Sequence, residues 1–174
     1  MPGCTDRLPV ELDPFRMAEL GRRLQGCLDF KQMQRLLPLL EAKEGRLDAR
    51  LDFGIDEQGQ AWLQGEIRTE VVLQCQRCLE KMQYPIVAEF RLALLRHESE
   101  AENIPDEYEP LIVTTVPVRT VDILEDELIL SLPVIAKHQH DCLAELNSKD
   151  ETGQETSVDT QNPFAVLAEL KKEH

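Results

Sequence analysis

The strongest constraint on the fold is an alternation of apolar and polar residues that begins at residue 46. A β-strand turns successive side chains to opposite faces, so this period of two is typical of a strand half buried against a core. A turn sequence, Asp56 to Gly59, interrupts the alternation, which resumes on odd positions from Ala61 to Cys75. The pattern predicts a long antiparallel hairpin.

The apolar positions change parity after Cys78, because from Met82 to Leu94 they are even-numbered. The segment from Cys75 to Cys78 is therefore predicted to be a turn between two strands. A short apolar run at residues 111–113 extends the predicted strand region to about residues 46–115. Helical spacing then predicts a helix over about residues 121–131.

Two helices are predicted before the strands. Asp13 can cap a helix that has Pro14 in its first turn, over about residues 14–23. Phe30, Met33, Leu36 or Leu37, and Leu40 recur at helical spacing, and Pro38 should end or kink the pattern, which predicts a second helix over residues 30–37. We therefore expect an α+β fold in a single domain, residues 1–146, whose antiparallel sheet is either open or barrel-like.

The last part of the chain has a different composition. Residues 147–161 are polar and acidic without apolar periodicity, which indicates a flexible linker. Residues 162–174 begin with an Asn-Pro cap and carry apolar side chains at helical spacing, which predicts a terminal amphipathic helix.

The chain of 174 residues has 33 acidic and 19 basic residues, a formal net charge of −14. Residues 1–96 hold 15 acidic and 14 basic residues, whereas residues 97–174 hold 18 and 5. A nucleic-acid binder that works by counterion release is expected to be basic. The second half is therefore an acidic surface for which phosphate is not the obvious partner.

Neither the N-terminus nor any apolar run predicts a targeting or membrane segment, since Leu36 to Leu40 is too short to span a bilayer. We expect a cytoplasmic protein without a membrane partner. Its five cysteines, an odd number, favour reduced thiols or metal ligands over a disulfide framework.

Four residues in two pairs form the sharpest chemical pattern: Cys75-x2-Cys78 and His138-x3-Cys142. Zinc prefers tetrahedral thiolate and imidazole ligands, so the pairs predict a structural Cys3His zinc site. His140 is an alternative fourth ligand that spacing alone does not distinguish from His138. The alternatives are unrelated reduced cysteines, or a redox dithiol that Arg77 alone would favour, although such pairs commonly use a helix N-terminus.

Catalytic motifs are otherwise absent from the sequence, so we expect no enzymatic activity. A zinc ion with four protein ligands leaves no position for water activation. The acidic residues of the predicted helix, Asp122, Glu125, Asp126 and Glu127, are interpreted as a solvated face rather than an acid–base pair.

The even positions Arg50, Trp62 and Arg68, together with the nearby Arg46 and Arg91, suggest a surface that could contact RNA through cations and one aromatic ring. These five are the candidate RNA-contacting residues. The alternative, which we favour, is that these cations pair with acidic residues across strands.

Five blocks, in order, resemble the large ribosomal RNA subunit accumulation protein (YceD) family. They are residues 12–14 (LDP), 72–78 (VLQCQRC), 104–110 (IPDEYEP), 121–134 (VDILEDELILSLPV) and 162–168 (NPFAVLA). Other branches of the family look similar around the second ligand pair but carry cysteine in place of His138, which adds support to zinc.

The resemblance implies a role in accumulating 23S ribosomal RNA, and hence in large-subunit biogenesis, without an assigned enzymatic activity. On this basis we expect the partner to be a basic ribosomal protein or a pre-ribosomal large-subunit particle. The acidic half would bind it through charge complementarity. Direct contact with 23S rRNA is the second hypothesis, and a zinc or dithiol enzyme is the third.

Overall fold

The computed structural model describes residues 7–142 of the chain. The chain divides into a unit of residues 1–139 and a second unit of residues 140–174, of which residues 140–142 are described. The linker predicted for residues 147–161 and the helix predicted for residues 162–174 lie outside the described residues.

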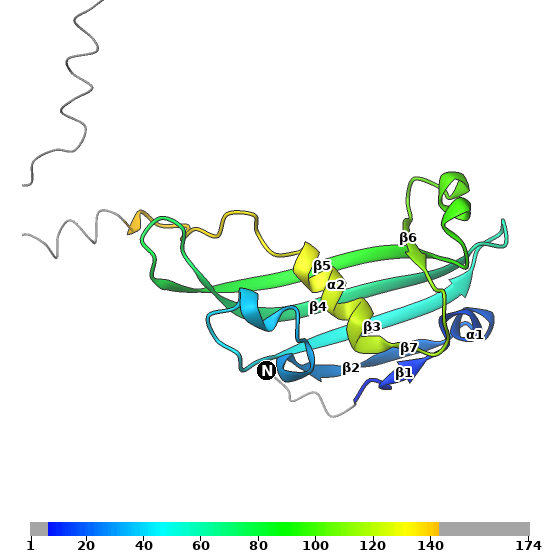
Figure 1. Cartoon of the computed structure of the whole chain (residues 1–174), viewed down its shortest axis with the longest axis horizontal. Coiled ribbons are helices and arrows are strands. Elements are labelled where there is room, and N and C mark those ends of the chain that lie inside the picture. The colour runs from blue at the N-terminus through cyan, green and yellow to red at the C-terminus, as the bar shows by residue number, and fades with distance from the viewer. Residues whose placement is uncertain (1–6, 143–174) are drawn as a thin grey trace, which may run out of the picture. The chain divides into compact units, whose positions relative to one another are not determined.

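A five-stranded sheet dominates the first unit, with the order β2-β3-β4-β5-β6 (Figure 1). Strands β2 to β5 are antiparallel neighbours, and β6 runs parallel to β5. Strands β2 and β6 are the two edges, so the sheet is open rather than barrel-like, and the α+β class is confirmed. The strands are β2 (Arg23–Asp29), β3 (Arg46–Ile55), β4 (Ala61–Gln74), β5 (Lys81–Leu95) and β6 (Glu109–Ile112).

Strands β3, β4 and β5 follow the period-two pattern closely. Asp56 shapes the turn between β3 and β4, because its Oδ1 accepts the backbone N–H groups of Gln58 and Gln60 at 3.0 and 2.8 Å. On the buried face, Phe90 of β5 packs over its cross-strand neighbour Gly65 of β4, and a Cβ atom at residue 65 would overlap its ring. This glycine therefore admits a large aromatic side chain into the core.

Helix α2 (Thr120–Leu130) lies across one face of the sheet (Figure 1). Its side chains Val121, Ile123, Leu124 and Leu128 are buried, the last two at 0% exposure, whereas Leu130 at its end is exposed. A two-stranded pair, β1 (Glu11–Leu12) with β7 (Val118–Arg119), and helix α1 (Pro14–Glu19) complete this side. Within residues 7–142, no helix is both long and apolar enough to cross a membrane.

Both helices predicted before the strands need correction. The first ends at Glu19 and does not reach residue 23, because the chain there enters β2. The second, predicted over residues 30–37, is replaced by turns and two short 3-10 helices, η1 (Phe30–Gln32) and η2 (Leu37–Leu39). A third 3-10 helix, η3 (Glu98–Asn103), lies in the acidic loop between β5 and β6, residues 96–108.

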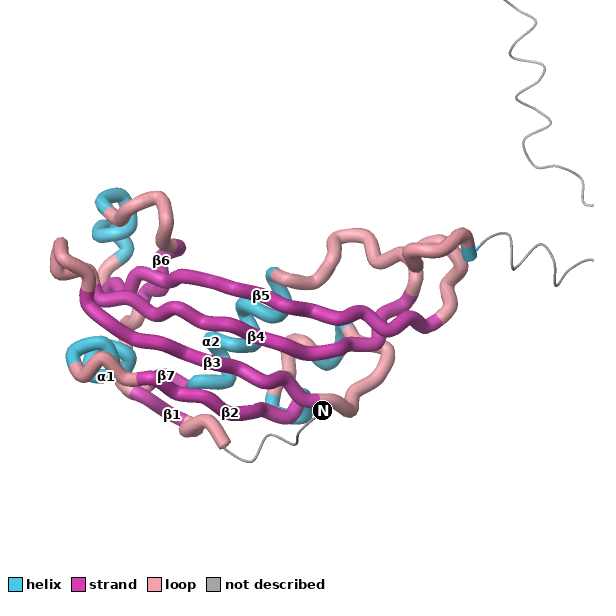
Figure 2. Tube along the Cα trace, turned by 180° about the vertical axis from the view of Figure 1, so that it is seen from behind, coloured by secondary structure: helices cyan, strands magenta, loops and turns pink. Residues whose placement is uncertain are grey.

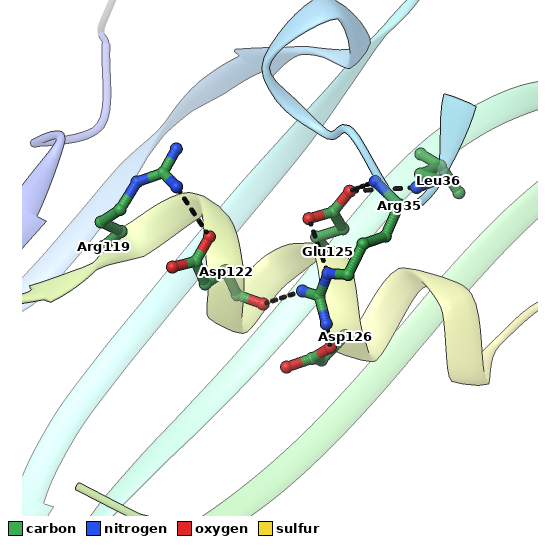
Figure 3. A network of polar contacts seen from close by, with 6 residues as sticks. All are labelled: Arg35, Leu36, Arg119, Asp122, Glu125 and Asp126. Carbon is green, nitrogen blue, oxygen red and sulfur yellow. Dashed lines mark hydrogen bonds and ion pairs between the residues drawn. The ribbon is translucent and has the colours of Figure 1, made fainter. Parts of the chain in front are cut away.

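Glu125 corrects the interpretation of α2 as carrying only solvated acidic residues. It is 3% exposed, and its Oε1 accepts the backbone N–H groups of Arg35 and Leu36 at 2.6 and 3.0 Å (Figure 3). The Arg35 side chain also donates to Oε2 of Glu125, at 3.2 Å, and to Asp126. Glu125 thereby ties the loop before η2 to the helix that covers the sheet.

Candidate metal centre

The Cys75–Cys78 turn connects β4 to β5, as the change of parity predicted. The backbone N–H of Cys75 donates to the Glu80 carbonyl at 2.9 Å, and the N–H of Leu79 donates to the Cys75 carbonyl at 2.8 Å. Leu79 has φ of 62°, a left-handed conformation that is uncommon for a leucine. A conformation of this kind is kept only where neighbouring contacts hold it in place. The two backbone hydrogen bonds therefore define a tight turn that carries both cysteines.

The segment at residues 136–138 lies against this turn. The backbone N–H of Gln76 donates to the Ala136 carbonyl at 2.8 Å, and the Arg77 guanidinium donates to the His138 carbonyl at 3.2 Å. Nδ1 of His138 then lies 3.4 Å from Sγ of Cys78. Two segments about 60 residues apart in sequence thus present ligand-type atoms to the same point.

One ligand-type atom from each of Cys75, Cys78, His138 and Cys142 lies within 4.8 Å of the other three. A zinc ion at ~2.3 Å from tetrahedral sulfur ligands would hold them roughly 3.8 Å apart, so a small contraction would close the group on a metal ion. Cys142 also follows His138 by only four residues. The arrangement could bind a metal ion, and among the described residues His140 is not part of it.

The surroundings of the Cys75 thiol lower its pKa and so favour the thiolate, the form that binds a cation. Burial of its sulfur raises the pKa, but hydrogen bonds from the backbone N–H groups of Cys78, His138 and Arg77, and from the Cys78 side chain, favour the thiolate and lower the pKa to about 5. The Arg77 N–H lies 3.5 Å from this sulfur. A thiolate is the form that metal ions bind, so the turn favours the ligating state at neutral pH.

The five candidate RNA-contacting residues all stand on the face of the sheet opposite α2, which Figure 2 shows from its open side. In the described structure, however, this face carries six cationic and six carboxylate side chains on strands β2 to β5. They are Arg23, Arg46, Arg50, Arg68, Lys81 and Arg91, with Asp29, Asp48, Asp52, Glu66, Glu70 and Glu89.

Several of these arginines form ion pairs. Arg50 pairs with Asp52 and Arg68 with Glu66, each along its own strand rather than across strands. Arg91 pairs with Glu107, 3.2 Å away in the acidic loop. Trp62 lies over Gly54 of the neighbouring strand, where a Cβ atom would overlap the indole. The face is therefore close to neutral, and its aromatic ring is half buried.

Two contacts of the centre were not expected from the sequence. The pattern named the four ligands but gave Arg77 no part in placing His138. The bond from Gln76 to Ala136 is made by backbone atoms, for which no residue type is diagnostic. A basic residue inside the Cys-x2-Cys pair is the one available signal, and alone it does not indicate a carbonyl 61 residues away.

Comparison with known proteins identifies a protein family and a relative that covers nearly the whole chain. The family model described as "Large ribosomal RNA subunit accumulation protein YceD" matches residues 63–171, a range that includes both ligand pairs. A Haemophilus influenzae protein of the same description is 28% identical over 170 residues, which cover 95% of this chain and 97% of the relative. No solved structure matches the chain.

Proposed function

Because the chain belongs to the large ribosomal RNA subunit accumulation protein YceD family, we propose that it is a non-enzymatic factor of large ribosomal subunit biogenesis. The family description names accumulation of the large ribosomal RNA, and the match over residues 63–171 is the observation that carries the proposal. A relative of the same description aligns over 95% of the chain. In this proposal the protein supports the synthesis, processing or accumulation of 23S rRNA in the cytoplasm.

The metal centre has a structural role in this proposal. Three sulfurs and one imidazole nitrogen are a donor set typical of zinc, and four protein ligands fill a tetrahedral site. The ion would join the β4–β5 turn to the segment that follows α2. Zinc bound by these residues would supply cross-linking rather than catalysis.

The acidic second half is the proposed surface for a basic ribosomal protein. In the described structure, Glu98, Glu102, Asp106 and Glu109 are exposed around η3 and β6, and residues 97–118 contain no lysine or arginine. The open sheet face, in contrast, carries balanced charge. Charge complementarity at the acidic surface would speed association with a cationic partner.

The experiment compares two charge-neutralised variants of the full chain. One replaces Glu98, Glu100, Glu102, Asp106 and Glu107, with Gln for Glu and Asn for Asp. The control replaces Asp29, Asp48, Glu57, Glu70 and Glu89 in the same way, so both variants change the net charge equally. The first should slow association with purified basic ribosomal proteins and flatten its salt dependence, because screened long-range attraction chiefly sets the on-rate. Equal on-rates for the wild type and both variants at low salt would contradict this surface.

Direct rRNA binding is the second candidate, supported by the gathering of Arg46, Arg50, Trp62, Arg68 and Arg91 on one open face. Substitution of Arg50→Ala or Arg68→Ala would then abolish a specific complex with 23S rRNA fragments. The ion pairs of these arginines with Asp52 and Glu66 lead us to expect no such loss. Nuclease treatment before pulldown separates the two candidates, since a basic protein partner would survive it.

A further inference from the structure

We propose that Arg77 is a positioning residue for the metal centre, which places His138 as a ligand without itself touching the metal ion. The inference rests on the proposed metal centre and assigns a role to one residue of this chain. Arg77 lies between Cys75 and Cys78 and is half-buried. Its backbone and its side chain contact different ligand-bearing segments.

The backbone of Arg77 contacts the first ligand pair, because its N–H lies 3.5 Å from Cys75 Sγ. The side chain contacts the second pair, because Nη2 donates to the His138 carbonyl oxygen at 3.2 Å. A bond to this carbonyl fixes the main chain at the residue whose Nδ1 lies 3.4 Å from Cys78 Sγ. Arg77 thereby fixes the position of the His138 main chain, from which the imidazole ring reaches the cysteine sulfurs.

The guanidinium suits this task because it is charged and presents several donors in a rigid fork. The neighbouring bond, from the Gln76 N–H to the Ala136 carbonyl, holds the same segment two residues earlier. That bond belongs to the backbone, so it remains when Arg77 is substituted. The contribution of the guanidinium can therefore be measured with the rest of the turn intact.

Outer contacts of this kind raise metal affinity by orienting the ligands, and their loss typically costs on the order of tenfold or more. We expect Arg77→Ala to bind Zn²⁺ about tenfold more weakly than the wild type in competition with a chromophoric chelator. We also expect altered visible absorption bands in the Co²⁺-loaded variant, since these bands report the ligand geometry. Arg77→Lys keeps a charged donor and should recover part of both properties.

Lys137→Ala provides the matched control. Lys137 is exposed, adjoins His138 and has no side-chain hydrogen bond or ion pair among the described residues, so this variant removes one positive charge from the same neighbourhood. Its Zn²⁺ affinity and Co²⁺ spectrum should match those of the wild type. Far-UV circular dichroism of each variant would show that the sheet has folded, and Arg77→Gln replaces Arg77→Ala if that variant fails to fold.

Wild-type affinity and an unchanged Co²⁺ spectrum in the folded Arg77 variant would overturn the role of Arg77 while leaving the metal centre in place. An equal loss in Lys137→Ala would also overturn it, because the effect would then come from charge. A wild-type chain that binds neither Zn²⁺ nor Co²⁺ would refute the metal centre itself, and the inference with it.

Discussion

Nδ1 of His138 lies 3.4 Å from Sγ of Cys78, although 60 residues separate the two in the chain. The nitrogen nearer to the main chain is thus the one that faces the sulfur. A metal ion bound here would close a loop that contains β5, β6 and α2. Its removal should therefore loosen the segment after α2 before it affects the strands.

We expect purified protein to contain about one zinc ion per chain, with Cys75 and Cys78 protected from thiol reagents until a chelator is added. Chelation should increase hydrogen exchange at residues 133–139 and leave exchange within β3 and β4 unchanged. Elemental analysis, thiol titration and exchange mass spectrometry provide the readouts. Full labelling of both thiols, with no metal detected in chelator-free protein, would refute the prediction.

Glu125→Ala should destabilise the fold by about 3 kcal/mol, because it leaves the Arg35 and Leu36 amides without their acceptor. Glu125→Gln keeps an acceptor oxygen and should cost less. Asp126→Ala removes a more exposed partner of Arg35 and should cost less than about 1 kcal/mol. Urea unfolding curves of the three variants measure the differences, and equal costs for Glu125→Ala and Asp126→Ala would show that the buried acceptor is unimportant.

Glu127 should make stability fall as the pH rises. Burial, followed by the charges of Glu109 and Asp126, raises its pKa to about 7. The pKa of Glu127 is higher in the folded state, so the folded protein binds this proton more tightly than the unfolded chain does. The resulting stabilisation is fully present below the pKa of the unfolded chain, roughly 4.3, and is lost as the pH rises through about 7.

Glu127→Gln removes this dependence. The melting temperature of the variant relative to wild type should therefore increase between pH 5 and pH 8. Glu57→Gln, an exposed residue in the β3–β4 turn, is the control and should show no such trend. A constant difference between Glu127→Gln and wild type across this range would contradict the raised pKa.

Gly65→Ala should cost roughly 1–3 kcal/mol, because the added methyl group would overlap the Phe90 ring. The overlap disappears when the ring is removed, so the same substitution should cost less in a Phe90→Leu background. A double-mutant cycle with thermal or urea unfolding measures this coupling. Additive effects would mean that residue 65 does not contact the ring.

The sheet was largely predictable where apolar residues alternate, from Leu47 to Leu94. Strand β2 escaped detection because its buried positions include Gly26, which carries no apolar signal, and Leu28. Phe30, Met33 and Leu36 are all buried as their spacing suggested, yet short 3-10 turns place them there. Spacing indicates which side chains are buried, but it does not fix the backbone conformation, which also depends on tertiary contacts such as the hydrogen bonds from the Arg35 and Leu36 amides to Glu125.

The candidate site was predictable in its donor types rather than in its supports. Cysteine and histidine are the usual zinc ligands, so the two pairs could be predicted as ligands from the sequence alone. The buried acceptor at Glu125 could not, because glutamate on a helix is usually solvated and its partners lie about 90 residues away. The role of Arg77 was missed because its partner, the His138 carbonyl, lies 61 residues away in the chain.

The strand order from β2 to β5 repeats the order of the sequence, and this has a consequence for how the chain reaches its fold. Each antiparallel pair in this run joins consecutive strands, so the longest connection that must close before those pairs form is residues 30–45, between β2 and β3. The pairing of β1 with β7, the contact of Glu125 with Leu36 and the approach of His138 to Cys78 all join distant segments. We expect the meander to assemble early, and α2 with its following segment to be added to a sheet that already exists.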